Sequence, residues 1–147
     1  MVCFGTHDTP TLAGYLKGRD IDWWQKLNWI DGEKARGAKR EREHDIQNLT
    51  TLATSQAKTE PDGFPTQRDA IYDILARSNA AMVSVQLDDV FGTVEAQNLP
   101  GTINEHPNWR RKYPSPIEHL KSDIHLEKIS NIMATHDRSN RPADERT

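Results

Sequence analysis

A histidine and an aspartate stand next to each other near the start of the chain, directly after a short apolar run. His7 and Asp8 follow residues 1–5, whose apolar character is typical of a strand. Such a pair beyond the end of a strand can perform acid–base chemistry, bind a metal ion or hold a polar ligand. The residue pattern alone favours a simpler interpretation, in which Asp8 helps to cap the next helix and His7 fills a turn.

A metal ion is not expected at this pair. Metal sites need several ligands at suitable spacing, and neither His-x-His nor Glu-x-x-His occurs near the pair. The single cysteine, Cys3, cannot form an internal disulfide, and no Cys/His spacing suits a structural zinc site. We therefore expect Cys3 to pack as a small buried apolar residue in the first strand.

A second apolar run, residues 80–87, is also followed by polar residues, the acids Asp88 and Asp89. This run is almost continuously apolar and comes after a helical pattern, which is typical of a parallel strand covered on both faces. Beyond it, residues 93–114 form a long stretch without regular periodicity. Loops of this length are usually functional in compact domains.

The elements that must position these residues are mostly helical. Apolar periodicity and capping residues predict helices over residues 10–17, 20–30, 33–53, 66–79 and 115–132. Thr9 and Ser115 are the expected N-caps of the first and last of these helices, and Gly18 is expected to end the first. Residues 54–65 are predicted to be a linker, and the polar tail 135–147 is predicted to be disordered.

The order of elements predicts an α/β fold with two parallel strands. Two such strands do not form an independent sheet, so the pattern fits part of a (β/α) barrel or doubly wound sheet better than a whole one. In parallel α/β folds, the residues that follow the strands form the catalytic face. The acids and the histidine after the two runs are therefore expected to meet on one face.

Composition excludes several functional classes. Nineteen Lys and Arg against 22 Asp and Glu give a formal net charge of −3, with no excess of positive charge for nucleic-acid binding. The basic residues of 34–42 are interrupted by acids and are expected to form a solvated helix face. No apolar run suits a membrane span or a secretory signal, which predicts a cytoplasmic protein. Leu, Ile, Val and Phe make up about 19% of the residues, which is lean for an independent core.

Two blocks of the sequence resemble a known family. Residues 5–20, GTHDTPTLAGYLKGRD, are similar to a strand–loop–helix segment of the amylomaltases, the 4-alpha-glucanotransferases of glycoside hydrolase family 77. Residues 82–113, MVSVQLDDVFGTVEAQNLPGTINEHPNWRRKY, resemble the C-terminal signature of that family. The signature places an acidic pair, Asn-x-Pro-Gly and Pro-Asn-Trp-Arg-Arg in this order. Two blocks in the same order make the match specific.

The resemblance implies a (β/α)8 TIM barrel, of which this chain is the C-terminal segment. It corresponds to about strands 7 and 8 with their helices and is mostly helical by residue count. Residues 1–134 are then the C-terminal part of a glucanotransferase catalytic barrel. The start inside a strand and the lean apolar composition fit a core whose packing partners lie in other barrel segments.

The resemblance also implies retaining chemistry with a covalent glycosyl–enzyme intermediate. Asp8 matches the aspartate that stabilises the oxocarbenium-like transition state through hydrogen bonds to the reacting glucose. His7 is expected to contact the same sugar, and Asn98 of the Asn-x-Pro-Gly motif is expected to bind a glucan hydroxyl. No cofactor is implied. The nucleophile and the general acid/base belong to earlier strands and are not found in this sequence.

Four acids of the second block are not expected to replace the missing nucleophile and acid/base, because the family motif gives these positions other places in the barrel. They are Asp88, Asp89, Glu95 and Glu105. Asn98 has a second interpretation, in which it only shapes a turn with Gly101. Trp109 either lines the barrel mouth or, as we expect, buries its ring to anchor the loop. The three tryptophans of 20–30 either stack on sugars or, as helical spacing favours, pack in the interior.

Two functional hypotheses follow. In the first, the chain is the C-terminal part of an enzyme that transfers 1,4-alpha-glucan segments between maltooligosaccharides or to glucose, and it is inactive alone. In the second, it is a non-catalytic split-gene fragment that binds carbohydrate or complements the rest of a barrel. The expected partners are a glucan substrate and the missing N-terminal part of the barrel, with neither nucleic acid nor membrane.

Overall fold

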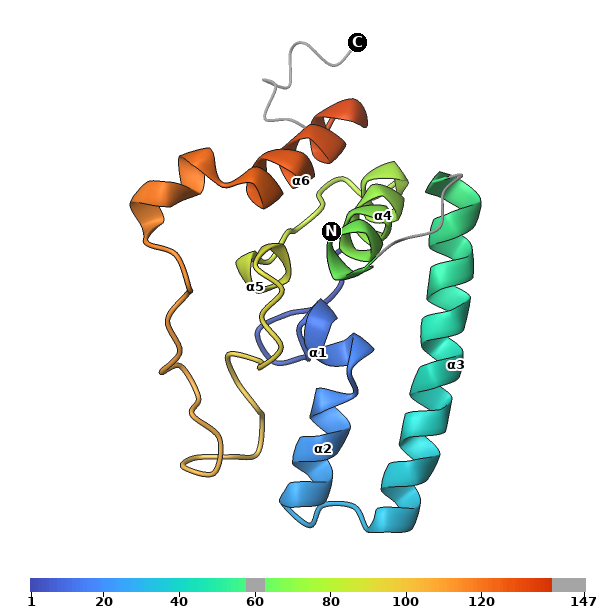
Figure 1. The fold of residues 1–147 in the computed structure, drawn as a ribbon, viewed down its shortest axis with the longest axis vertical. Coiled ribbons are helices and arrows are strands. Elements are labelled where there is room, and N and C mark those ends of the chain that lie inside the picture. Colours follow the sequence, from blue (N-terminus) through green and yellow to red (C-terminus); the bar gives the residue numbers. More distant parts are fainter. Residues whose placement is uncertain (58–62, 139–147) are drawn as a thin grey trace.

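The computed structural model describes residues 1–57 and 63–138. These residues form six α-helices and one 3-10 helix, and no β-strand occurs among them (Figure 1). The α-helices are α1 Leu12–Leu16, α2 Arg19–Lys26, α3 Gly32–Ala57, α4 Gly63–Arg77, α5 Leu87–Val90 and α6 Ile124–Thr135, and the 3-10 helix is Ile117–Ser122. The prediction of a mostly helical chain is therefore confirmed.

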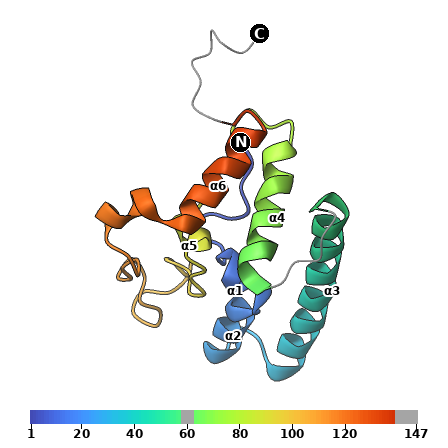
Figure 2. The same ribbon diagram turned by 45° about the horizontal axis from the view of Figure 1, so that its top comes forward.

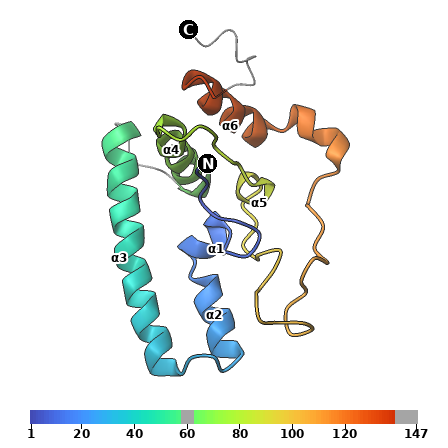
Figure 3. The ribbon, with the colours of Figure 1, turned by 180° about the vertical axis from the view of Figure 1, so that it is seen from behind.

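Four helices pack side by side in the order α2, α3, α4 and α6. Helices α2 and α3 run antiparallel as a hairpin, α4 packs against α3, and α6 packs on the other side of α4 (Figures 1 and 2). The hairpin turn is fixed by Asp31, whose carboxylate accepts the backbone N–H of Lys34 at 2.8 Å in the first turn of α3. Seen from behind, α3 and the irregular segment 93–116 lie at opposite sides, with α1, α2 and α5 between them (Figure 3).

The two predicted strands are reduced to a single parallel bridge between Val2 and Val83. The backbone N–H of Val2 donates to the carbonyl of Met82, and that of Ser84 donates to the carbonyl of Val2, both at 2.9 Å. The parallel pairing of the two runs is as predicted, but two full strands are wrong. A ladder of two strands is marginal without further strands beside it. Cys3, in the first of these runs, is half-buried and not fully buried as predicted.

Capping explains where α1 differs from the prediction. Thr11 caps the helix, because its hydroxyl accepts the backbone N–H of Gly14 at 3.0 Å. The hydroxyl of Thr9 instead accepts the backbone N–H of Thr6 at 2.7 Å and closes the preceding turn. The prediction that Thr9 caps this helix was therefore wrong. Gly18 follows α1 with φ +65°, as expected of a glycine that ends a helix.

The last predicted helix is divided in two. Ser115 does not cap it, and the chain first makes the 3-10 helix Ile117–Ser122. Asp123 then caps α6 by accepting the backbone N–H groups of His125 and Leu126 at 3.0 and 2.9 Å. Part of the predicted linker 54–65 is helical in α3 and α4, residues 58–62 lie outside the described residues, and so do residues 139–147 of the predicted tail.

A buried carboxylate joins three helices in the core. Asp89 of α5 has no exposed surface, and it accepts the backbone N–H of Leu12 at 2.7 Å and the hydroxyl of Tyr72 at 2.6 Å. Burial raises the pKa of Asp89 more than these hydrogen bonds lower it, and burial also raises the pKa of Tyr72. Asp89 therefore holds α1 and α4 to α5 and plays a structural part.

We expect Tyr72→Phe to lower the free energy of unfolding by about 1–2 kcal/mol, because a buried carboxylate oxygen loses its donor. Urea denaturation followed by circular dichroism measures the change. Tyr113→Phe is the matched control, since Tyr113 is 42% exposed and its hydroxyl lies 3.4 Å from Asp88. An equal loss in both variants would contradict the structural part given to the Tyr72–Asp89 bond.

No helix in residues 1–57 and 63–138 is long and apolar enough to span a bilayer.

Candidate functional site

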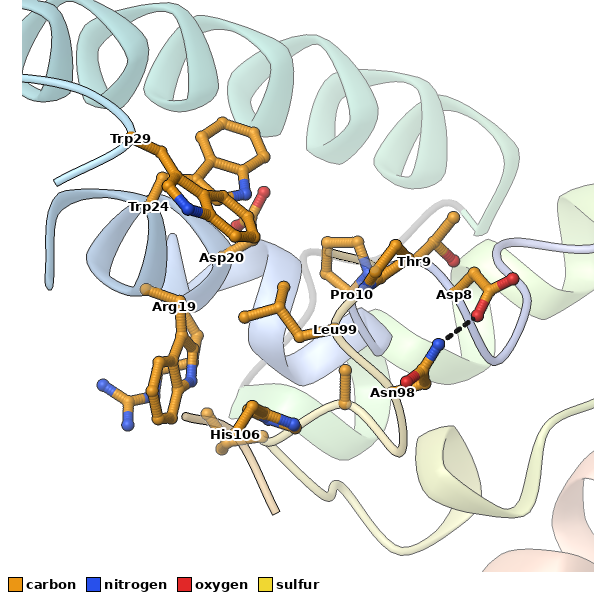
Figure 4. A pocket seen from close by; sticks show the side chains of 14 residues that line it. Asp8, Thr9, Pro10, Arg19, Asp20, Trp24, Trp29, Asn98, Leu99 and His106 are labelled. Atoms are coloured by element: carbon orange, nitrogen blue, oxygen red, sulfur yellow. Dashed lines mark hydrogen bonds between the residues drawn. The ribbon is translucent and has the colours of Figure 1, made fainter. Parts of the chain in front are cut away.

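A cavity of about 230 Å³ lies between residues 8–10, helix α2 and the loop that holds Asn98 (Figure 4). Its lining includes Pro10, Trp24, Trp29 and Leu99, with Asp8 and Asn98 at one end. Ligand pockets usually enclose about 300–1,000 Å³, so this cavity is small for a complete site. It combines an apolar wall with a few polar groups, which is the usual make-up of a small-molecule site.

The three predicted site residues lie together, with Asp8 and Asn98 in the lining of the cavity and His7 beside Asp8. The side-chain amide of Asn98 donates to one carboxylate oxygen of Asp8 at 2.6 Å. The Nε2 atom of His7 lies 3.2 Å from the other oxygen, and the His7 and Asp8 side chains are 61% and 47% exposed. Because a carboxylate offers about four acceptor positions, Asp8 can accept further hydrogen bonds from a ligand.

A tight turn presents Asp8 to the cavity. The backbone N–H of Thr9 donates to the carbonyl of Thr6 at 3.1 Å, and the backbone N–H of Asp8 lies 3.3 Å from the Thr6 hydroxyl. The interpretation of Asp8 as a helix cap is contradicted, because Thr11 performs that task. The carboxylate is therefore available for contacts outside the helix.

The loop that holds Asn98 is fixed by its own side chains. Asn108 accepts the backbone N–H of Leu99 at 2.9 Å and donates to the carbonyl of Thr102 at 3.1 Å. Between them Gly101 adopts φ +85°, which only glycine adopts without strain. The loop thus makes the turn of the second interpretation, and the Asn98 side chain reaches Asp8, while its contact with a glucan hydroxyl stays a prediction. Asn108 stands in the Pro-Asn-Trp-Arg-Arg motif, but the motif did not indicate that its side chain fixes the loop.

A buried histidine supports the same loop. His106 is 1% exposed, and its Nδ1 atom lies 2.6 Å from Oδ1 of Asn108. Since that oxygen can only accept, Nδ1 carries the proton and Nε2 is left to face Arg111 at 3.5 Å. The His106 ring also meets the Trp23 ring edge-on at 4.9 Å. The loop is thereby joined to α2.

Glu95 connects the start of the loop to α2. Its carboxylate accepts Nε of Arg19 at 2.7 Å and the indole N–H of Trp23 at 2.9 Å. Burial alone would raise the pKa of Glu95, but the hydrogen bonds from Arg19 and Trp23 and the charges of Arg19 and Arg111 outweigh it and hold this pKa below its ordinary value. Glu95 is thus an ion-paired positioning residue.

The tryptophans of 20–30 all line the cavity, but they differ in exposure. Trp23 is buried and packs as expected, whereas Trp29 is exposed. The side chain of Trp109 is 62% exposed, so the expectation that it buries its ring was wrong. Its ring centroid lies 5.3 Å from that of His7. Helical spacing could not reveal that Trp29 reaches the cavity, because Trp29 lies beyond the end of α2.

The predicted solvated face of residues 34–42 needs one correction. Arg42 is largely buried, forms a bidentate ion pair with Asp20 at 2.8–2.9 Å and covers the ring of Tyr15. Asp20 lines the cavity, and Arg42 therefore neutralises the acid that accompanies Asp8 there. The reason is geometric: the hairpin places this side of α3 against α2.

The geometry limits the chemistry of this cavity. A retaining glycosidase mechanism uses two carboxyl groups about 5–5.5 Å apart, one as nucleophile and one as acid/base. Among the described residues that line the cavity, Asp8 and Asp20 are the acids, and Asp20 is held by Arg42. The site can thus accept hydrogen bonds from hydroxyl groups and stabilise positive charge. In residues 1–57 and 63–138 no three His, Cys, Asp or Glu side chains are grouped so as to hold a metal ion.

Comparison with known proteins gives a consistent result. The sequence model of the 4-alpha-glucanotransferase family matches residues 1–118. The 4-alpha-glucanotransferase of Haemophilus influenzae is 29% identical over 84% of this chain and 19% of its own length. That of Mycobacterium tuberculosis is 32% identical over 88% of this chain and 18% of its own length.

A solved structure shows the same fold. The structure of the amylomaltase from Corynebacterium glutamicum superposes with a TM-score of 0.75 at 22% identity, over 89% of this chain and 21% of that protein. This likeness supports the prediction that the helices form part of a TIM barrel. The chain spans about a fifth of the length of the relatives that it matches. Since the family model covers most of its residues, the chain belongs to the 4-alpha-glucanotransferase family.

Proposed function

We propose that this chain supplies part of the glucan-binding face of a 4-alpha-glucanotransferase, with Asp8 as its transition-state stabiliser. The observation that supports this proposal is the contact between Asp8 and Asn98, two residues far apart in the sequence that meet at the open end of a cavity. Family membership supplies the substrate class, a chain of 1,4-linked glucose units.

Each of the three residues has a task that its chemistry suits. The Asp8 carboxylate accepts hydrogen bonds from two hydroxyls of the reacting glucose and stabilises the positive charge that develops on its ring. The amide of Asn98 and the imidazole of His7 hold this carboxylate from both sides. Both side chains remain exposed enough to contact the same sugar. They therefore act as substrate-binding residues.

The rest of the mechanism needs carboxylates that the described cavity does not offer. In the proposed reaction, a nucleophilic carboxylate attacks the anomeric carbon and displaces the leaving sugar, whose oxygen a second carboxyl group protonates. The same group then deprotonates the hydroxyl of the incoming glucan, which releases the nucleophile. Both groups would come from other segments of the barrel, whose strands 7 and 8 correspond here to residues 1–5 and 80–87. Carboxylates suffice for this chemistry, so no cofactor takes part.

We expect the chain to bind maltotriose weakly and Asp8→Asn to bind it about tenfold more weakly, because hydrogen bonds to a charged group contribute about 1.5–3 kcal/mol. NMR titration of the backbone and side-chain amides measures the affinity and identifies the residues that shift. Glu43→Gln, an exposed acid on α3, is the matched control and is expected to bind as the unchanged chain does. Identical affinities of the Asp8→Asn and unchanged chains would contradict the proposal.

A second experiment tests the catalytic part. The isolated chain is expected to release no glucose from maltotriose in a disproportionation assay. Glucose release is expected when the other barrel segments of a family enzyme are added and allowed to assemble with it. Release by the isolated chain would show that a nucleophile and an acid/base lie within these 147 residues. Sugar binding without restored activity would favour a carbohydrate-binding module over an enzyme part.

A further inference from the structure

Trp109 is held in an unusual backbone conformation and exposes its ring. Its φ angle is +58°, in the left-handed region that bulky side chains rarely adopt. Its backbone N–H donates to the carbonyl of Gln97 at 2.9 Å, and the side chain of the preceding residue, Asn108, is fixed by the hydrogen bonds described above. Such strain persists only where the surroundings impose it, and it is concentrated at functional sites.

The exposed ring adjoins the site residues. Trp109 meets the His7 ring at a centroid distance of 5.3 Å and an interplanar angle of 48°. His7 in turn contacts Asp8, which accepts the amide of Asn98. The four side chains come from two segments, residues 7–8 and 98–109. They form a contiguous group, in which the exposed indole of Trp109 is the large apolar surface.

We propose that Trp109 is the stacking platform for a second glucose unit, next to the unit that Asp8 holds. A pyranose ring has faces of C–H groups with partial positive charge, and these suit the negative π face of an indole. Since His7, Asp8 and Asn98 already contact one another around the reacting unit, we assign the exposed indole to the neighbouring unit. The proposal rests on the proposed function and adds that Trp109 is the residue that determines a preference for two or more glucose units over one.

The surroundings of the ring favour a sugar over a protein segment as the occupant. The known ring contact of Trp109 is the imidazole of His7, and the next residue along the chain is the exposed Arg110. A saccharide offers both the C–H face for the indole and the hydroxyls for these polar groups. The group also contains an exposed carboxylate that accepts hydroxyl hydrogen bonds. An apolar protein contact would leave these polar groups without such partners.

The test is a titration of the full chain with glucose, maltose and maltotriose, followed by NMR. For the unchanged chain, affinity is expected to rise from glucose to maltose as the second unit reaches the indole. In Trp109→Ala this rise is expected to disappear, with maltose binding about three- to tenfold weaker and glucose binding unchanged. Trp109→Phe keeps a flat ring and is expected to retain most of the rise.

Met82→Ala is the matched control. Met82 is an apolar residue with the same exposed fraction as Trp109, 62%, and it lies in residues 80–87, outside the loop that holds Trp109. It is expected to change neither affinity, and amide spectra of all variants establish that each one is folded. If affinity still rose from glucose to maltose in Trp109→Ala, while Asp8→Asn bound sugar more weakly, the role of Trp109 would be contradicted and the proposed function would stand. If the unchanged chain bound none of the three sugars, the proposed function would fall, and the platform with it.

Discussion

Replacing Glu95 with alanine is expected to lower the free energy of unfolding by about 2–3 kcal/mol. The change leaves the indole N–H of Trp23 buried without an acceptor and removes the strongest partner of Arg19. The nearest other acid to Arg19 is Asp22, at 3.9 Å. Because the Glu95 side chain is about one quarter exposed, the expected loss stays below that of a fully buried ion pair.

The same residue gives stability a dependence on pH of known sign. The pKa of Glu95 is lower in the folded chain than its ordinary value of about 4.3. A carboxylate of this kind stabilises the fold fully above its unfolded pKa, and this contribution is lost as the pH falls through the folded pKa. Glu95→Gln is thus expected to be less stable than the unchanged chain at pH 6–7, with a difference that shrinks below about pH 4.

Urea denaturation at several pH values measures both effects. Glu118→Ala is the matched control, since Glu118 is an exposed acid in the 3-10 helix. It is expected to change stability by less than about 0.5 kcal/mol at any pH. A stability difference for Glu95→Gln that does not depend on pH would show that the ionised carboxylate is not what joins α2 to the loop.

The site could be predicted from the sequence because its residues stand in motifs. His7, Asp8 and Asn98 were identified from the Thr-His-Asp and Asn-x-Pro-Gly patterns, and they lie together in the structure. Periodicity alone would have assigned Asp8 to a helix cap, which Thr11 provides instead. The capping residue is the one whose hydroxyl faces the first free N–H groups of the helix. Thr9 and Thr11 have the same capping propensity, so the sequence alone does not show which of them caps α1.

Trp109 and Arg42 were misjudged for a common reason. Their exposure depends on which segments lie beside them, and residue type predicts it only on average. A large apolar ring is expected inside, yet the fixed loop around Asn108 turns Trp109 outward. A basic residue in a charged run is expected outside, yet the hairpin of α2 and α3 places Arg42 against Asp20. Long-range contacts of this kind leave no local pattern.

Gly14 of α1 packs directly against the backbone of Val94, with no space for a side chain. A Cβ atom at this position would lie far inside van der Waals contact of the Val94 carbonyl oxygen and 3.0 Å from the Thr11 hydroxyl. The Thr11 hydroxyl itself donates to the carbonyl of Thr93 at 2.5 Å. This hydrogen bond joins the start of α1 to residues 93–94 of the loop. Neither backbone can move aside without breaking that bond, and glycine is therefore required by space and not by its φ angle.

We expect Gly14→Ala to lower the free energy of unfolding by about 3 kcal/mol, through overpacking of α1 against residues 93–94. Gly37→Ala is the matched control: a Cβ there meets no atom within 4 Å, and alanine in the interior of α3 is expected to stabilise by about 0.5–1 kcal/mol. The displaced loop also carries Asn98 away from Asp8, so the Asn98 side-chain amide signal should shift and maltotriose binding should weaken. A Gly14→Ala chain as stable as the Gly37→Ala chain would mean that α1 and the loop are not in contact, and the Asp8–Asn98 pair would then lose its structural basis.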